Sequence, residues 1–360
     1  MPAGLPAGQG GATLVGMALS LSILDQSTIS VGRDAGAAIA ETLALARKAD
    51  SWGYARYWLA EHHNSQAHAG SAPEILIAAI AATTQRIRVG SAGIMLPHYA
   101  SLKVAEQFRA LEAIAPGRID LGVGRAPGSD GRTAIALNPM AMRQTEDRFP
   151  AQVMELLGWT GDGLPLNHAH AAITAQPVVS TRPQVWVLGS SDYGAQLAAY
   201  FGLPYCFAHF ITDGGGCGEA LALYHAQFRA DAGNLAAPLA ALGVFALAAE
   251  TEAEAERLFA SRALSRLLRD RGRFIPLPSP EEALEYPYTP AERARIAALR
   301  EQAMIGTPAK VLAKLEALAG SVGAAEVAIL SPCFDPVARA RSYELIAREA
   351  GLAQAMPIAA

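Results

Sequence analysis

The sequence lacks the features that mark several large classes of protein. It has only three cysteines, Cys206, Cys217 and Cys333, and their wide, odd-numbered arrangement predicts neither a disulfide framework nor a zinc knuckle. The formal net charge is −4 and no long block of like charge occurs, which argues against nucleic acid or an anionic membrane as a partner. No uncharged apolar run reaches about 18 residues, so no membrane span is expected.

Two familiar site motifs are also missing. Gly122 and Gly124 form a G-x-G pair, but the third glycine and the directly following helix of a dinucleotide-binding fingerprint are absent. The histidines do not form an H-E-x-x-H motif, so a metal-dependent barrel hydrolase has little support and no metal ligand is assigned.

What the chain does have is length and apolar content. Its 360 residues are 51% hydrophobic, which is enough for a substantial core. Residues 1–16 are rich in glycine, alanine and proline without the pattern of a signal peptide, and we expect a flexible amino-terminal tail there. We expect one domain over residues 17–355. The few unpaired cysteines fit a reducing compartment and predict a cytoplasmic protein.

Short apolar runs alternate with helical patterns along the chain. Such alternation predicts parallel strands joined by right-handed crossovers, and eight strand–helix units favour a (β/α)8 TIM barrel with insertions after strands 4 and 7. The eight expected strands are Ala18–Leu24, Ala55–Ala60, Ile87–Met95, Ile119–Gly124, Gln184–Leu188, Pro204–Phe210, Leu242–Ala249 and Glu326–Leu330.

The expected helices include Ala37–Trp52, a helix opened by Pro73, Ser101–Ala115, Ala195–Phe201 and Ala309–Ala319, the last ended by Gly320. The first insertion, Ala126–Pro183, predicts a helix near Thr145–Leu157 and a hairpin around Leu164–Val179. The second insertion contains the proline-rich segment Gly272–Pro290, which is either a lid over the site or a disordered spacer.

The first candidate site residues stand directly after a predicted strand, in Ala60-Glu61-His62-His63-Asn64. Residues just past the carboxyl end of a parallel strand commonly face a ligand crevice. A histidine there can move a proton or bind a metal. Adjacent residues of an extended chain point to opposite sides, so we expect one of His62 and His63 to face the crevice and the other to pack.

Three further strand ends are candidates for ligand contact. Arg125 follows Gly124 and can pair a phosphate, or form a surface salt bridge. Gly189, Ser190 and Ser191 precede a helix, where hydroxyls and free N–H groups bind anions; simple helix capping is the other reading. The small residues from Ser91 to Gly93 indicate either close approach of a ligand or tight packing inside the barrel.

With these motifs in view, the chain resembles the bacterial luciferase-like flavin monooxygenase family from about Leu19 to Leu345. The motifs that carry the resemblance are Ala60–Asn64, Gly90–Pro97, Pro116–Gly128 and Ile305–Pro308. The resemblance implies a barrel that binds FMN at its carboxyl-terminal face. It implies that Ala92 and Gly93 lie against the flavin ring, often with a non-prolyl cis peptide. It also implies that Arg125, Ser190 and Ser191 hold the phosphate, with Gly124 and Gly189 beside them.

The resemblance further implies the chemistry. Reduced FMN from a separate flavin reductase would react with O2 and oxygenate a small organic substrate of unknown identity. His62 matches the family's catalytic histidine and His63 its second histidine. Luciferase proper has cysteine where this chain has Gly124, and glutamate where it has Ser190.

Two alternatives stay open, a deazaflavin-dependent hydride transferase and a non-catalytic flavin-binding protein. Family members are commonly homodimers through early helices, here Ser71–Thr84 and Ser101–Ile114.

Overall fold

A computed structural model describes residues 19–126, 128–140 and 147–352. The expected tail over residues 1–16, the first two residues of the helix predicted from Thr145 and the last three residues of the expected domain lie outside this part. None of the helices in the described part is long and apolar enough to cross a membrane.

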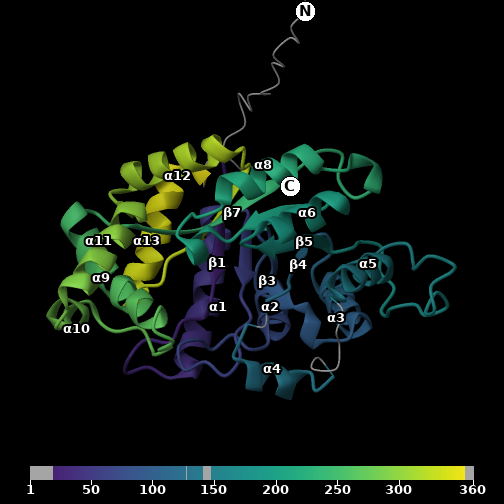
Figure 1. Ribbon diagram of the computed structural model, residues 1–360, viewed down its shortest axis with the longest axis horizontal. Coiled ribbons are helices and arrows are strands. Elements are labelled where there is room, and N and C mark those ends of the chain that lie inside the picture. Colours follow the sequence, from purple (N-terminus) through teal and green to yellow (C-terminus); the bar gives the residue numbers. More distant parts are fainter. Residues whose placement is uncertain (1–18, 127, 141–146, 353–360) are drawn as a thin grey trace, which may run out of the picture.

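The strands alternate with helices in the predicted order (Figure 1). The strands are β1 (Ser20–Asp25), β2 (Arg56–Leu59), β3 (Arg88–Met95), β4 (Ile119–Gly124), β5 (Gln184–Gly189), β6 (Tyr205–Phe207), β7 (Ala240–Ala248), β8 (Met304–Gly306) and β9 (Glu326–Leu330). The α-helices are α1 (Ala35–Trp52), α2 (Pro73–Ala81), α3 (Ser101–Ile114), α4 (Gly131–Leu137), α5 (Phe149–Thr160), α6 (Asp192–Tyr200), α7 (His209–Thr212), α8 (Cys217–Gln227), α9 (Glu252–Arg269), α10 (Pro280–Glu285), α11 (Pro290–Gln302), α12 (Pro308–Val322) and α13 (Pro336–Glu349); the 3₁₀ helices are η1 (Leu96–His98) and η3 (Ala230–Ala232).

The sheet closes on itself. The strand order is β6-β5-β4-β3-β2-β1-β9-β7, and β6 also pairs with β7. Every pairing is parallel. The eight predicted strands correspond to β1–β7 and β9, which form the closed barrel. The predicted (β/α)8 fold is confirmed. The short strand β8 was not predicted; it pairs only with the end of β7, over Ala246–Ala248.

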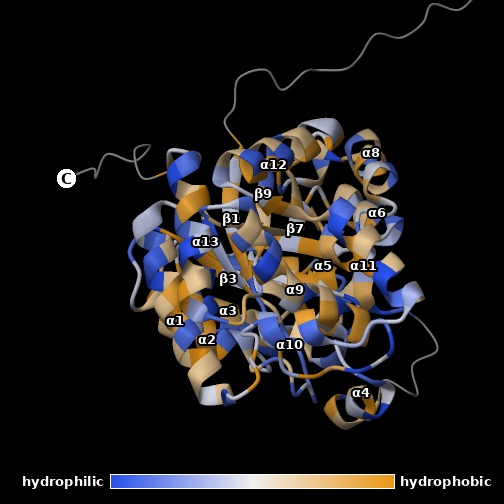
Figure 2. Ribbon diagram, turned by 90° about the vertical axis from the view of Figure 1, so that its left-hand side faces the viewer, coloured by the Kyte–Doolittle hydropathy of each residue, from blue (hydrophilic) through white to orange (hydrophobic). Residues whose placement is uncertain are grey.

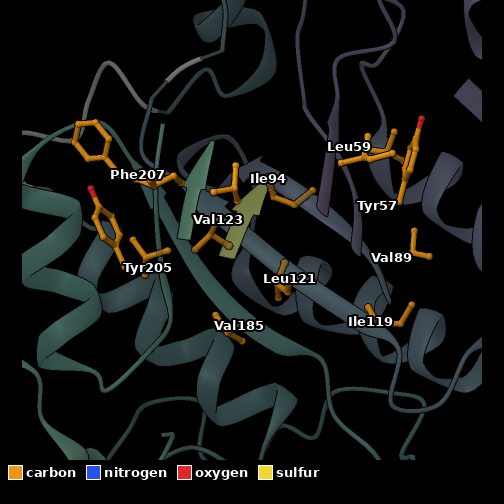
Figure 3. Close-up of a cluster of buried hydrophobic side chains, with 14 of the residues drawn as sticks. Tyr57, Leu59, Val89, Ile94, Ile119, Leu121, Val123, Val185, Tyr205 and Phe207 are labelled. Carbon is orange, nitrogen blue, oxygen red and sulfur yellow. The ribbon is translucent and has the colours of Figure 1, made fainter. Parts of the chain in front are cut away.

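Each barrel strand sends alternate residues to opposite sides. On β4, Ile119, Leu121 and Val123 point outward into the apolar layer between strands and helices (Figure 3). The intervening Asp120 faces the inside of the barrel, where it accepts hydrogen bonds from Arg56 Nη1 (2.8 Å) and Trp58 Nε1 (2.9 Å). Coloured by hydropathy, the β7 region reads as mainly apolar (Figure 2), in line with its complete burial.

The interior is filled in layers from the amino-terminal end. Arg56 pairs with Asp120 and, through Nε, with Glu326 at 3.0 Å. Above it, the rings of Trp58 and Trp186 pack edge to face at 4.9 Å between centroids. The layer above that is apolar and includes Leu24 and Leu330. Because the lower barrel is full, open space is left at the carboxyl-terminal mouth.

One expectation about the first insertion and one about a helix end are wrong. The predicted helix is observed as α5, but Leu164–Val179 forms turns instead of a hairpin. Leu166 and Val178 are 99% and 65% exposed, whereas Leu164 and Ala175 are buried, so the apolar residues of the segment do not line one common buried face. Helix α12 runs through Gly320 and ends at Gly323, where the backbone turns left-handed with φ of 68°.

The proline-rich segment Gly272–Pro290 is structured. Pro280 and Pro290 stand in the first turns of α10 and α11, whose starts carry complete capping boxes from Ser279 and Thr289. Leu277 forms a bridge with Ser30 of the loop after β1. The segment thus joins the rim of the barrel mouth.

A pair of glycines on β4 allows a test of the barrel packing. A Cβ at Gly122 would lie 2.0 Å from the Ser91 carbonyl oxygen, whereas a Cβ at Gly124 would meet nothing nearer than 3.9 Å. We expect Gly122→Ala to lower the free energy of unfolding by about 1–3 kcal/mol or more, because strand backbone must shift. Gly124→Ala is the matched control and should unfold at the parent's urea midpoint. Equal midpoints for both variants would contradict this packing.

Candidate active site

A largely apolar cavity lies where the predicted strand ends meet. It measures about 270 Å³ and its walls come from the carboxyl ends of β3, β4 and β5 and from the residues after β6. All seven residues predicted to contact a cofactor line it, namely Ala92, Gly93, Gly124, Arg125, Gly189, Ser190 and Ser191. His62 and His63 are not among its lining residues.

Gly93 and Gly124 both line this cavity, but only at Gly93 does a neighbouring strand exclude a side chain. The Ala92–Gly93 peptide bond is cis, and the pairing of β3 with β4 shifts register between Ser91 and Ile94. A Cβ at Gly93 would come within 2.7 Å of the Gly122 carbonyl oxygen, so the neighbouring strand alone requires glycine there. Gly124 has no such neighbour, and its missing side chain leaves room on the cavity wall.

Arg125 stands at the cavity edge in a cluster with two residues that the sequence did not single out. Its Nη1 lies 3.2 Å from Asp147 Oδ2, and its guanidinium lies over the Tyr193 ring at 3.9 Å. Tyr193 donates from its hydroxyl to the same carboxylate at 2.5 Å. Burial and this bond raise the pKa of Tyr193 to about 12, so the phenol stays protonated. Arg125 forms a salt bridge with Asp147, and half of its side chain is still exposed. It can therefore also bind a ligand.

The turn after β5 presents hydroxyl groups to the cavity. Ser191 is the N-cap residue of α6, yet its side chain makes no capping hydrogen bond. Its carbonyl oxygen instead accepts a bond from the Tyr205 hydroxyl at 3.1 Å, which holds the turn in place. Helix capping therefore does not occupy the Ser191 hydroxyl.

A buried carboxylate, Glu61, organises the region beside the cavity. It is completely buried and accepts hydrogen bonds from His63 Nε2 (2.7 Å), the Tyr99 hydroxyl (2.7 Å) and the Met95 backbone N–H (3.0 Å). Met95 lines the cavity, so Glu61 ties the histidine to the cavity wall. Glu61 belongs to the motif Ala60–Asn64, but the sequence alone predicted no role for it.

The two adjacent histidines do diverge, as expected. The chain leaves the strand and turns at Asn64, which has a left-handed φ of 50°. His63 is fixed by Glu61, whereas the His62 ring stacks on His68 at 4.3 Å between centroids. The buried Nδ1 of His62 has no hydrogen-bond partner among the described residues.

His62 is uncharged at neutral pH. Burial, with the positive charges of Arg269 and His63 acting in the same direction, lowers the pKa of His62 to about 4. The pKa of His68 is lowered to about 3, again chiefly by burial. An unpartnered neutral imidazole nitrogen can accept a proton from a group placed against it.

The cavity also contains a thiol. Cys206 lines it, and burial raises the pKa of this thiol well above its usual range. Within the described residues, no group of three or more His, Cys, Asp or Glu side chains is arranged for a metal ion.

Comparison with known proteins gives consistent results. The family model for luciferase-like monooxygenases matches residues 19–325. YwcH of Bacillus subtilis strain 168, which is uncharacterised, is 44% identical over 332 residues, 91% of this chain and 98% of YwcH. The N-acetyl-S-alkylcysteine monooxygenase of the same strain is 38% identical over 332 residues, 91% of this chain and 97% of that protein. The crystal structure of apo-MsnO8 superposes with a TM-score of 0.81 at 36% identity, covering 93% of this chain and 98% of that one.

More distant structures share the fold alone. The oxygenating constituent of 3,6-diketocamphane monooxygenase of Pseudomonas putida, in complex with FMN, has a TM-score of 0.70 at 22% identity and covers 92% of this chain and 97% of its own. An F420-dependent secondary alcohol dehydrogenase has a TM-score of 0.62 at 12% identity, covering 93% of this chain and 99% of its own. Since the family model spans nearly the whole barrel, the resemblance drawn from the motifs is confirmed: this chain belongs to the luciferase-like monooxygenase family.

Proposed function

We propose that this protein is an FMN-dependent monooxygenase that uses reduced flavin and O2 to oxygenate a small organic substrate. The observation that carries the proposal is the meeting of the seven predicted strand-end residues around one cavity. FMN supplies the reaction of reduced flavin with O2, and the chain supplies binding, orientation and proton transfer.

The residues present fit FMN at both ends of the molecule. A phosphate needs several donors close together, and Arg125 with the Ser190 and Ser191 hydroxyls at the start of α6 provides them. A flat ring needs small apolar walls, and Ala92, Gly93 and the open space at Gly124 provide those. The ends of β3 and β4 would therefore hold the ring, and Arg125 with the turn after β5 would hold the phosphate.

His62 would hold or accept a proton beside the bound flavin. At neutral pH its imidazole is neutral, and its Nδ1 has no partner among the described residues, so this nitrogen is available for a hydrogen bond to a bound group. His63 would act as a positioning residue, since Glu61 already engages its Nε2.

Further expectations concern access and partners. The segment Gly272–Pro290 would cover the site during turnover, since it already contacts the loop after β1 through Leu277. Reduced FMN would come from a separate flavin reductase in the cytoplasm. Ile75 on α2 and Ile114 on α3, 66% and 50% exposed, would contribute to a homodimer interface.

Titration with cofactors tests the proposal directly. We expect FMN and reduced FMN to bind with saturable changes in flavin fluorescence or absorbance, and reduced FMN on the protein to consume O2. Tighter binding of a deazaflavin than of FMN, with no reaction toward O2, would instead indicate the hydride-transferring alternative. Binding of FMN without any effect on the reaction with O2 would indicate a non-catalytic flavin-binding protein.

Replacing Arg125 separates the phosphate from the ring. We expect Arg125→Ala to weaken FMN binding by about 1.5–3 kcal/mol, roughly 10- to 100-fold in Kd, because a charge-assisted contact is lost. Riboflavin has no phosphate and should bind both proteins alike. Arg257→Ala is the control, because Arg257 pairs with Glu254 on the exposed face of α9. An unchanged FMN affinity in Arg125→Ala would refute the assignment.

Replacing Ser191 separates ligand binding from helix capping. We expect Ser191→Ala to weaken FMN binding about 3- to 10-fold and to leave stability unchanged, because the hydroxyl caps nothing. Thr251→Ala is the matched control, since the Thr251 side chain does cap α9. That variant should lose about 1 kcal/mol of unfolding free energy and keep its FMN affinity. The reverse pattern would show that Ser191 acts only in the fold.

Replacing the histidines one at a time tests their roles. We expect His62→Ala to keep FMN binding and to slow proton-coupled turnover by roughly 10²–10⁴-fold, as for loss of a general acid–base group. With no substrate in hand, rapid-mixing absorbance can follow reoxidation of protein-bound reduced flavin by O2. The rate and its pH dependence should change in His62→Ala.

The pH dependence itself is specified by the low pKa. Because the pKa of His62 is about 4, its neutral form should persist as pH falls to about 5, and ¹⁵N NMR should show no protonation of this ring near pH 6.5. The same shift predicts stability that is complete above pH 6.5 and declines toward pH 4, since the unfolded chain binds the proton first. If His63→Ala changes reoxidation and His62→Ala does not, the roles are exchanged.

A further inference from the structure

A second cavity at the barrel mouth is lined by three arginines and one histidine. It measures about 40 Å³, enough for a group of a few atoms, and receives Arg262 and Arg269 from α9, Arg273 from the following turn and His68 from the loop after β2. In Figure 1, α9 lies with α10 and α11 along the left edge of the molecule. None of the residues assigned to FMN lines this cavity.

The two α9 arginines have no anionic partner of their own. Neither guanidinium forms a hydrogen bond or an ion pair within the described part of the chain. Two carboxylates, Asp213 and Asp270, act on both of them through space. Those carboxylates are already bonded to Arg266, at 3.0 and 2.9 Å, and to Arg295, both at 2.9 Å.

The same helix shows what a satisfied arginine looks like there. Arg266, between the other two, donates to Asp213, to Asp270 and to the Phe210 and Ile211 carbonyl oxygens. Arg262 instead lies over the ring of Phe245, 5.2 Å from its centre. Burial, with the charges of Arg269 and Arg266, lowers the pKa of Arg262 to about 9. A partly buried, unpaired guanidinium destabilises a fold unless an anion neutralises it.

One histidine relates this cavity to His62. His68 lines the cavity, and its ring stacks on the His62 ring at 4.3 Å between centroids, so the His68 ring separates an anion held by the arginines from His62. Phe210 lines the 270 Å³ cavity of the candidate active site. Phe210 and Arg262 together line another, smaller cavity. The remaining walls include Ile275, Leu277 and Leu330, which are apolar.

The geometry points to a substrate subsite: Arg262 and Arg269 bind the acidic head group, a carboxylate or sulfonate, of an organic substrate whose apolar portion extends toward His62. This assignment rests on the proposed monooxygenase function and specifies its substrate class. A guanidinium fork fits such a planar or tripodal anion with paired hydrogen bonds. His68, whose Nδ1 bonds to Ser65 Oγ at 3.0 Å, would separate the head group from the reacting end.

Binding of simple probes to the full-length chain tests the subsite, with and without FMN. Hexanoate and hexane-1-sulfonate carry the head group, and hexanamide is the neutral match; calorimetry or ligand-observed NMR gives each Kd. We expect at least one acid to bind about tenfold tighter than the amide. Arg262→Gln and Arg269→Gln should each remove most of that preference, while Arg269→Lys keeps more of it than Arg269→Gln.

The control is Arg257→Gln, on the exposed face of the same helix, which should behave as the parent. Equal binding of acids and amide, or an equal loss in Arg257→Gln, would overturn the subsite. Competition between hexanoate and FMN would also overturn it, because the arginines would then hold the flavin phosphate. We expect the α9 variants to keep the FMN affinity of the parent. Failure of the parent to bind FMN would refute the proposed function. The probes, measured without FMN, would still test whether the arginines bind an acidic head group.

Discussion

The barrel depends on one buried cation. Arg56 reaches from β2 to Asp120 of β4 and to Glu326 of β9, and so joins strands from both sides of the lower barrel. Removing one partner from such a buried group costs about 3–5 kcal/mol, because the remaining charge is left uncompensated. The guanidinium also lies 4.9 Å from the centre of the Trp186 ring. The ion pairs of Arg56 therefore position the Trp58 and Trp186 rings, and these rings fill the barrel interior below the cavity at its carboxyl-terminal end.

Above that floor, Glu61 performs a similar task at smaller scale. One carboxylate satisfies a histidine, a tyrosine and a backbone N–H, so the end of β2 and the end of β3 are held in register. The consequence is a difference between neighbouring residues: the Nε2 of His63 is bonded to Glu61, whereas the Nδ1 of His62 has no hydrogen-bond partner among the described residues. A site of this kind is preorganised by groups that do no chemistry themselves.

The sequence could predict what depends on local pattern. Eight strands were identifiable because parallel strands buried on both faces are almost continuously apolar. The three-residue β8 was too short for such a pattern, and the expected hairpin failed because the apolar residues of Leu164–Val179 do not share a buried face. Helix α12 passed Gly320 because an isolated glycine costs a helix only about 1 kcal/mol, whereas Gly323 must turn left-handed.

The same limit applies to the site. Strand-end residues such as Arg125 and Ser191 were identifiable because topology brings the carboxyl ends of parallel strands together. Asp147, which pairs with Arg125, and the α9 arginines were not, because their positions follow from long-range packing of the insertions. Tyr193 lies only two residues after Ser191, but its contact with Arg125 depends on the approach of β4 to α6 in the folded barrel. No local spacing in the sequence encodes those contacts.

Strand β7 has nine residues and two successive partners on one edge. It pairs with β9 over Ala241–Phe245 and with β8 over Ala246–Ala248. The pairing of β7 with β9 therefore closes the barrel without β8, and the unit from α9 to β8 is attached outside that closed barrel. For protein engineering, this makes residues 252–306 an exchangeable cassette: related chains could supply new versions of this unit while the strand ends on the opposite side of the mouth stay as they are.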